Sequence, residues 1–188
     1  MTHASSGERP GPAVTLGLLA AWALHDAEEL ALLPGWLRRN APVLRERFPR
    51  VPDAVWRRAE SLDAREFTVA VGVMAAIVAA ASAAGHATGG RSAGYQAALN
   101  GFGLHGLVHL AQAAAVRGYT PGSATSFVLV VPFTLWARGR LRRAGVLRPT
   151  RPRDLAVGLG LAAAATVASH AAARRLPARR LPGGRGNF

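Results

Sequence analysis

The sequence predicts an all-α fold, a polytopic membrane helical bundle of four to five transmembrane helices. The first observation is the length of its apolar segments. Residues 67–84 are 18 residues without a charged side chain, and residues 155–173 are 19 residues with His170 as their one titratable group. A bilayer core about 30 Å thick needs roughly 20 mostly apolar residues in a helix. The second observation is that the arginines lie between the apolar segments and not along one of them.

The charge of the chain supports the same fold class. All basic residues are arginine and the formal net charge is +13, with eight arginines in residues 38–65, seven in 138–153 and five after residue 173. Arginines that flank apolar segments contact anionic headgroups. No aromatic-interleaved basic patch or nucleic-acid fold signature is present. The sequence therefore predicts a lipid bilayer as partner, in the cell membrane with several passes, and no nucleic acid.

The first part of the chain is predicted to hold one transmembrane helix. Residues 1–12 are polar and predicted to be disordered, and the helix over 13–33 ends at the Pro34–Gly35 stop signal. Residues 21–23 also fit the cleavage site of a signal peptide, but the single preceding Arg9 and the apolar residues after Glu29 weigh against it. Residues 52–63 are expected to form either an interfacial helix around Trp56 or a solvated loop.

The remaining helices are predicted from apolar segments and the turns between them. They span residues 67–84, 95–117, 123–136 and 154–173, which completes a membrane helical domain over 13–173, and an Arg-rich tail over 174–188 is expected to be disordered. The arginine groups before and after the middle helices give conflicting orientations, so 123–136, which contains Pro132, is the weakest span. Because alanine is only weakly hydrophobic, a soluble Ala-rich helical bundle is the alternative.

One block of charge interrupts the first predicted helix. It reads His25-Asp26-Ala27-Glu28-Glu29. A charged side chain at mid-bilayer costs on the order of 3 kcal/mol. On a helical wheel His25, Glu28 and Glu29 fall within an arc of about 100°, with Asp26 at its edge. The block therefore presents one polar face that needs partners.

The helix predicted over 95–117 offers such partners. His105 and His109 are four residues apart, and Gln112 follows close to the same face. Nearby glycines at 101, 103 and 106 are expected to let this helix pack closely on a neighbour, or to bend it so that Asn100 turns inward.

These two faces together predict a metal site. The chain has no cysteine, so thiolate ligands are excluded. His25, Glu28, Glu29, His105 and His109 can ligate one or two divalent ions, and such nitrogen and carboxylate ligands suit Zn, Fe or Mn. Glu28 or Glu29 could instead act as a general base toward a metal-bound water. A shared site requires ligand atoms within about 5 Å of one another.

The same residues resemble a known family of bacterial membrane proteins, the HXXEE family. The resemblance lies in residues 25–29, in Asn100 to His109 and in Tyr119-Thr120-Pro121-Gly122, and covers roughly residues 13–135. It implies an integral membrane protein of several helices with no established activity, and it adds Asn100 and Tyr119 to Gln112 as supporting residues.

Three functions fit these observations. The first is a membrane metalloprotein, which could be an enzyme that acts on a hydrophobic substrate. The second is a small proton-coupled transporter, which would need a homo-oligomer because the chain is short. The third is a structural protein whose polar residues only join helices.

Overall fold

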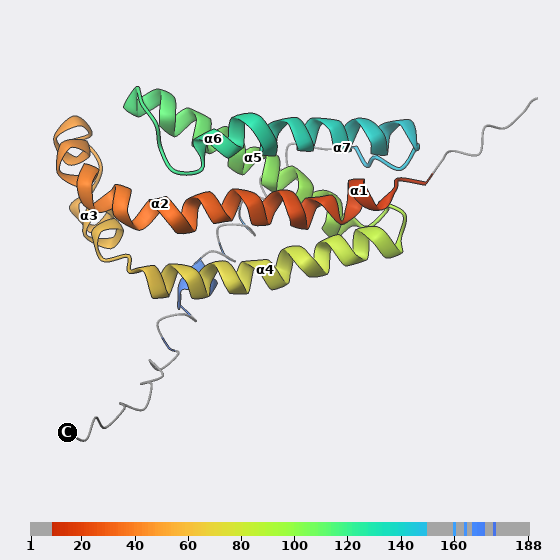
Figure 1. Ribbon diagram of the computed structural model, residues 1–188, viewed down its shortest axis with the longest axis horizontal. Coiled ribbons are helices and arrows are strands. Elements are labelled where there is room, and N and C mark those ends of the chain that lie inside the picture. Colours follow the sequence, from red (N-terminus) through yellow and green to blue (C-terminus); the bar gives the residue numbers. More distant parts are fainter. Residues whose placement is uncertain (1–8, 150–159, 161–163, 165–166, 172–174, 176–188) are drawn as a thin grey trace, which may run out of the picture.

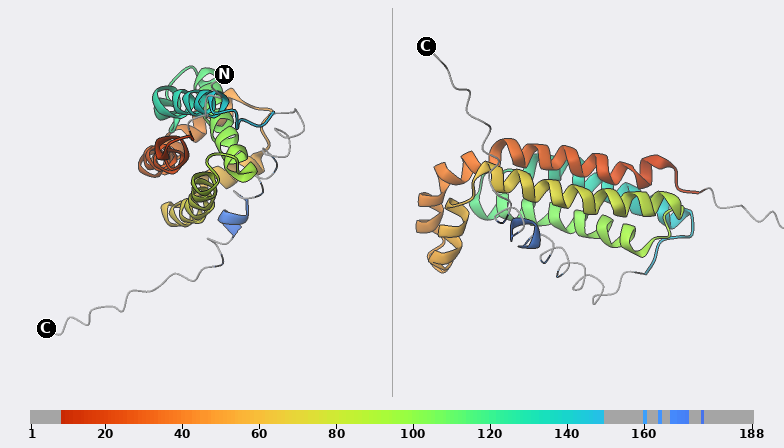
Figure 2. Two further views of the ribbon diagram at one scale, coloured as in Figure 1. Left: turned by 90° about the vertical axis from the view of Figure 1, so that its right-hand side faces the viewer. Right: turned by 90° about the horizontal axis from the view of Figure 1, so that it is seen from below.

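The computed structural model describes residues 9–149, 160, 164, 167–171 and 175. These residues form helices and no strands, which confirms the all-α prediction. The elements are α1 (Pro12–Thr15), α2 (Gly17–Arg47), α3 (Asp53–Glu60), α4 (Ala64–Ala87), α5 (Ala93–Val116), α6 (Ser123–Thr125), the π-helix η1 (Ser126–Val130) and α7 (Val131–Arg143). Helices α2, α4 and α5 and the segment from α6 to α7 pack side by side, and α3 lies across one end of them (Figures 1 and 2).

The predicted end of the first helix at Pro34–Gly35 is wrong. Helix α2 continues through Pro34 and Pro42 to Arg47. A proline removes one backbone hydrogen bond and crowds the preceding turn, but here Pro34 is buried and the last turns of α2 pack on α3. Arg47 Nη1 also donates to the carbonyl oxygen of Val116 at 2.7 Å, which ties this end of α2 to α5. Tertiary contacts therefore outweigh the local stop signal.

Side-chain caps begin α4 and α5. The Asp63 carboxylate accepts from the backbone N–H of Glu66 at 2.6 Å, so α4 starts at Ala64 and not at residue 67. The Ser92 hydroxyl accepts from the N–H of Tyr95 at 3.2 Å, so α5 starts at Ala93 and not at 95. The predicted span 123–136 is present as α6, η1 and the first turns of α7.

Small residues bring the helices close together. A Cβ atom on Gly103 would lie 2.6 Å from Thr134 of α7, and one on Gly106 would lie 2.8 Å from Val130 of η1. Gly101 faces open space, so two of the three glycines have the expected packing role. Pro132 has no N–H to continue the α-helical pattern, and the backbone widens into the π-turn of η1 just before it.

The apolar core fills the half of the bundle nearest α1. Tyr95 is fully buried there, stacks against Gly85 of α4, and donates its hydroxyl to the carbonyl oxygen of Val14 at 2.5 Å. The cluster comprises Val14, Leu18, Ala21, Trp22, Val78, Tyr95, Leu99, Phe102, Val130, Ala137 and Leu141. Beyond Trp22 and Phe102 the interior becomes polar, and this is where the candidate site begins.

One described helix is long and apolar enough to cross a membrane. It is α4, whose most apolar 18-residue window has a mean hydropathy of 2.1 and is only 17% buried within the bundle. The prediction of four to five spans goes beyond this finding. The predicted helix over 154–173 and the tail over 174–188 lie mostly outside the described residues, although 167–171 are helical and His170 Nδ1 lies 2.8 Å from Glu66 Oε1.

Candidate functional site

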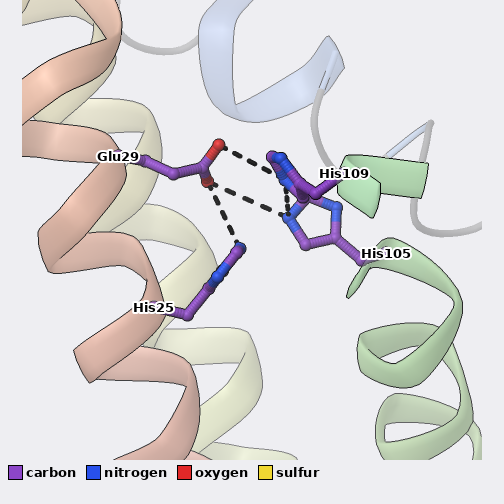
Figure 3. A group of neighbouring side chains, drawn as sticks. All are labelled: His25, Glu29, His105 and His109. Carbon is purple, nitrogen blue, oxygen red and sulfur yellow. Dashed lines mark hydrogen bonds and ion pairs between the residues drawn. The ribbon is translucent and has the colours of Figure 1, made fainter. Parts of the chain in front are cut away.

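His25 lies at the centre of the polar interior. It is fully buried on α2 and meets the edge of the Phe102 ring at a centroid distance of 5.9 Å. The imidazoles of His105 and His109, both on α5, approach it at centroid distances of 5.1 and 5.0 Å. Three imidazoles from two helices therefore converge on one point (Figure 3).

Glu29 supplies a carboxylate to the same point. It stands four residues after His25, so both side chains project from one face of α2. Its Oε2 lies 3.8 Å from His25 Nε2 and 3.9 Å from His105 Nε2, and its Oε1 lies 3.4 Å from His109 Nε2. The dashed lines of Figure 3 trace these contacts. The carboxylate thus faces all three imidazoles.

The four side chains meet the distance requirement for a shared site. The Nε2 atoms of His105 and His109 are 3.0 Å apart, as the i,i+4 spacing on α5 allows. One ligand atom from each of His25, Glu29, His105 and His109 lies within 4.8 Å of all the others. Donor atoms in a tetrahedron with bonds of about 2.0–2.1 Å are separated by about 3.4 Å. The contacts of 3.0 to 3.9 Å bracket this value.

Burial is uneven across the group. The side chain of His25 is 0% exposed and that of His109 is 8% exposed, whereas that of His105 is 47% exposed. The buried Nε2 of His25 has no hydrogen-bond partner among the described residues. The site therefore opens to its surroundings beside His105 and is closed around His25.

Glu28 does not join this group. Its Oε1 accepts from the Tyr119 hydroxyl at 2.5 Å and from the Gly122 N–H at 3.0 Å. Its Oε2 accepts from the Thr125 hydroxyl at 2.5 Å and from the Thr125 N–H at 2.9 Å. The expectation that Glu28 shares the ligand set is wrong. Glu28 lies at the opposite edge of the polar arc from Glu29 and contacts the start of α6.

Tyr119 and Gly122 belong to the turn that receives Glu28. Partial burial and the hydrogen bond to Glu28 raise the pKa of Tyr119 to about 12, so the phenol stays protonated and donates. Gly122 has φ of +86°, a conformation that favours glycine, and it packs against the His109 ring. The Tyr-x-Pro-Gly motif therefore contacts both Glu28 and His109 and packs directly beside the candidate site.

Thr125 was missed by the sequence reasoning. Its Oγ1 lies 2.8 Å from His25 Nδ1, and the same hydroxyl contacts Glu28. The two residues are 100 positions apart, so no local spacing points to their contact. The one available signal was the position of Thr125 just after the Tyr-x-Pro-Gly motif.

The other supporting residues lie away from the four clustered side chains. The Asn100 side-chain oxygen accepts from Arg138 of α7, so it is not turned inward toward the histidines. Gln112 is exposed on α5. Asp26 is buried on α2, outside the group of potential ligands.

The chain belongs to the family described as proteins of unknown function with an HXXEE motif. The model of that family matches residues 16–137. This confirms the resemblance seen in the sequence, and the matched range contains all four clustered side chains together with Gly122 and Thr125. No curated protein and no solved structure matches the chain.

Proposed function

We propose that this protein is an integral membrane protein that binds one divalent transition-metal ion between α2 and α5. The ligands would be His25, Glu29, His105 and His109. One observation carries the proposal: the fully buried Nε2 of His25 has no hydrogen-bond partner among the described residues, yet it faces a carboxylate and two imidazole nitrogens. A buried polar atom without a partner costs free energy, and a metal ion would give it one.

The donor set narrows the choice of metal. Three imidazole nitrogens and one carboxylate suit Zn, Fe or Mn better than Ca or Cu(I). Zn would be complete with these four ligands, whereas six-coordinate Fe or Mn would keep two positions for water or substrate. The exposure of His105 supports the second arrangement, because a metal there could be reached from outside.

An open position favours a metalloenzyme over a purely structural site. A bound metal activates water or polarises a substrate oxygen. Both oxygens of Glu28 already accept hydrogen bonds, two each, so Glu28 is poorly placed to act as a general base. Glu29 is the better candidate for a general base, and in that role it would not be a metal ligand. A hydrophobic substrate is consistent with a site inside an apolar bundle.

Two features support the membrane part of the proposal. The α4 helix is apolar but largely unburied within the bundle, whereas the core helix of a soluble protein would be mostly covered. Large apolar side chains are also exposed on the other helices of the bundle. They include Leu24 and Leu32 of α2, Leu107 and Val108 of α5, Phe127 and Val128 of η1, and Leu135 and Trp136 of α7.

The arginines complete this arrangement. At one end of the bundle they include Arg47, Arg58 and Arg65, and at the other Arg91 and Arg140. Arginines at the ends of an apolar middle lie where their side chains could reach the headgroups of a bilayer.

Metal analysis of the full chain tests the proposal. The protein is purified in mild detergent without chelator, and its metal content is measured for the parent, for His105→Ala with His109→Ala, and for His86→Ala. His86 is a histidine outside the group, so it is the matched control. We expect about one ion per chain in the parent and the control, and less than a tenth of that in the double variant. A parent without stoichiometric metal would overturn the metal site.

The membrane assignment has its own test. Membranes carrying the protein are washed with alkaline carbonate, which removes peripheral proteins. We expect the chain to stay in the pellet and to enter solution only with detergent. Release by carbonate alone would favour the soluble helical bundle.

A further inference from the structure

Glu28, Thr125 and His25 form a continuous chain of hydrogen bonds that ends at the candidate metal site. The Thr125 hydroxyl lies 2.5 Å from Glu28 Oε2 and 2.8 Å from His25 Nδ1. The opposite nitrogen of the same ring, Nε2, faces Glu29. The chain therefore connects a carboxylate outside the site to the back of a ligand inside it.

The direction of each hydrogen bond follows from counting protons. Glu28 faces four donors, which are the Tyr119 hydroxyl, the Gly122 N–H, and the N–H and hydroxyl of Thr125. An ionised carboxylate accepts hydrogen bonds and donates none. Thr125 has a single hydroxyl proton and three possible acceptors, which are Glu28 Oε2 at 2.5 Å, His25 Nδ1 at 2.8 Å and the Gly122 carbonyl oxygen at 3.4 Å. The ionised carboxylate is both the nearest and the charged acceptor of the three. The proton therefore points to Glu28.

This leaves a lone pair of the Thr125 oxygen facing His25. A neutral imidazole has a proton on one nitrogen and a lone pair on the other. Because the Thr125 proton is already used, Nδ1 of His25 must be the donor in the 2.8 Å contact. The Nε2 atom then has a lone pair and no proton.

The opposite tautomer is disfavoured by the geometry. It would place a proton on Nε2, whose nearest carboxylate oxygen, on Glu29, is 3.8 Å away and too distant for a hydrogen bond. It would also require the Thr125 hydroxyl to turn from the charged Glu28 to a neutral ring nitrogen. Charge-assisted hydrogen bonds are roughly twice as strong as neutral ones.

We propose that Glu28 and Thr125 are positioning residues that hold His25 as its Nδ1–H tautomer, with the Nε2 lone pair directed into the metal site. The inference rests on the proposed function for its purpose, although the tautomer itself exists without metal. Partners behind a metal-binding histidine fix its tautomer and ring orientation, and their loss typically costs 10- to 100-fold in metal affinity. The second glutamate of the motif, Glu29, is then a metal ligand, and the first, Glu28, fixes the tautomer of the ligand His25.

The tautomer is measured first, on metal-free protein. Full-length protein with ¹⁵N-labelled histidine is placed in lipid nanodiscs with chelator at pH 8, and His25 is assigned by its loss in His25→Gln. We expect the ¹⁵N shifts of an Nδ1–H imidazole in the parent and in Thr125→Ser, and a mixture of tautomers in Thr125→Val. A protonated Nε2 in the parent would overturn the inference.

Metal affinity is measured second, with Zn²⁺ and Mn²⁺ as probes. We expect Thr125→Val to bind 10- to 100-fold more weakly than the parent, and Thr125→Ser to bind within about threefold. Ser126→Ala is the matched control, because Ser126 is a buried neighbouring hydroxyl without a hydrogen-bond partner among the described residues. It should bind like the parent.

The two measurements separate the inference from the proposed function. A parent that has the Nδ1–H tautomer but binds neither ion contradicts the metal site and leaves the positioning of His25 intact. A parent that binds metal while Thr125→Val binds equally well contradicts the positioning role and leaves the metal site intact. Thermal unfolding of each variant checks that it remains folded.

Discussion

Gly122 lies so close to His109 that a Cβ atom on the glycine would sit 2.6 Å from Cε1 of the imidazole. The contact joins the turn before α6 to a potential ligand on α5. The glycine also has φ of +86°, which other residues rarely adopt. Two independent constraints therefore select glycine at one position beside the site.

Gly122→Ala should damage both stability and the site. Backbone strain of about 1 kcal/mol adds to the displacement of the His109 ring, so we expect a loss of about 2 kcal/mol or more in the free energy of unfolding and a weaker metal site. Thermal unfolding and metal content measure the two effects. Gly101→Ala is the control, because Gly101 is helical and faces open space. It should be neutral or slightly stabilising, and an equal loss in both variants would contradict the role of His109 packing.

Glu28→Gln and Glu29→Gln should separate the two glutamates of the motif. Glutamine at position 28 would turn an NH₂ group toward groups that now donate hydrogen bonds to Glu28. We therefore expect a loss of about 1–3 kcal/mol in the free energy of unfolding and a partial loss of metal. Glutamine at position 29 removes a ligand but none of the hydrogen bonds to the turn, so we expect at least a tenfold loss of metal with the metal-free protein about as stable as the parent.

These two outcomes are compared by metal analysis and by unfolding in chelator. The result that contradicts the assignment is the reverse pattern, with Glu28→Gln losing the metal at full stability. Substrate flux into proteoliposomes that is abolished by Glu28→Gln, in a protein without metal, would favour the transporter.

Removal of the metal should destabilise the protein in a pH-dependent way. An ion at 100 times its Kd adds about 2.7 kcal/mol, which for a chain of this size is a shift of about 5–10 °C in Tm. Metal-binding imidazoles must be neutral, so protons compete with the ion for the three histidines as the pH falls. The stabilisation is therefore largest near neutral pH and decreases as the pH is lowered.

Unfolding curves with and without chelator at each pH measure this difference. The His86→Ala control should keep the full shift at pH 7.5. A chelator effect that does not decrease as the pH is lowered would argue against histidine ligands.

The sequence could predict the contacts that depend on helical spacing. The pairs His25 with Glu29 and His105 with His109 are each four residues apart on one helix, so their shared face follows from the geometry of the α-helix alone. That α2 and α5 face each other at these positions follows from the sequence only through the need of buried charged groups for partners.

The sequence could not predict contacts set by packing between distant segments. Glu28 and Glu29 belong to one polar arc of the helical wheel, yet Glu28 contacts Thr125, which is 97 residues away. Asn100 likewise accepts a hydrogen bond from Arg138, which is 38 residues away. Pro34 reads as a stop signal because propensity is local, whereas the burial that keeps α2 helical there comes from tertiary structure.

The length of α2 has a practical consequence. Its 31 residues rise about 46 Å, whereas a bilayer core is about 30 Å thick and helices tilt by at most about 40°. If α2 crosses the membrane as proposed, tilt alone cannot place all of it in the hydrocarbon, and its last turns would project from the hydrocarbon together with α3. The hydrogen bond from Arg47 to the Val116 carbonyl oxygen holds this projecting end against α5. Outside the detergent belt it would offer antibody fragments a rigid epitope and crystals a lattice contact.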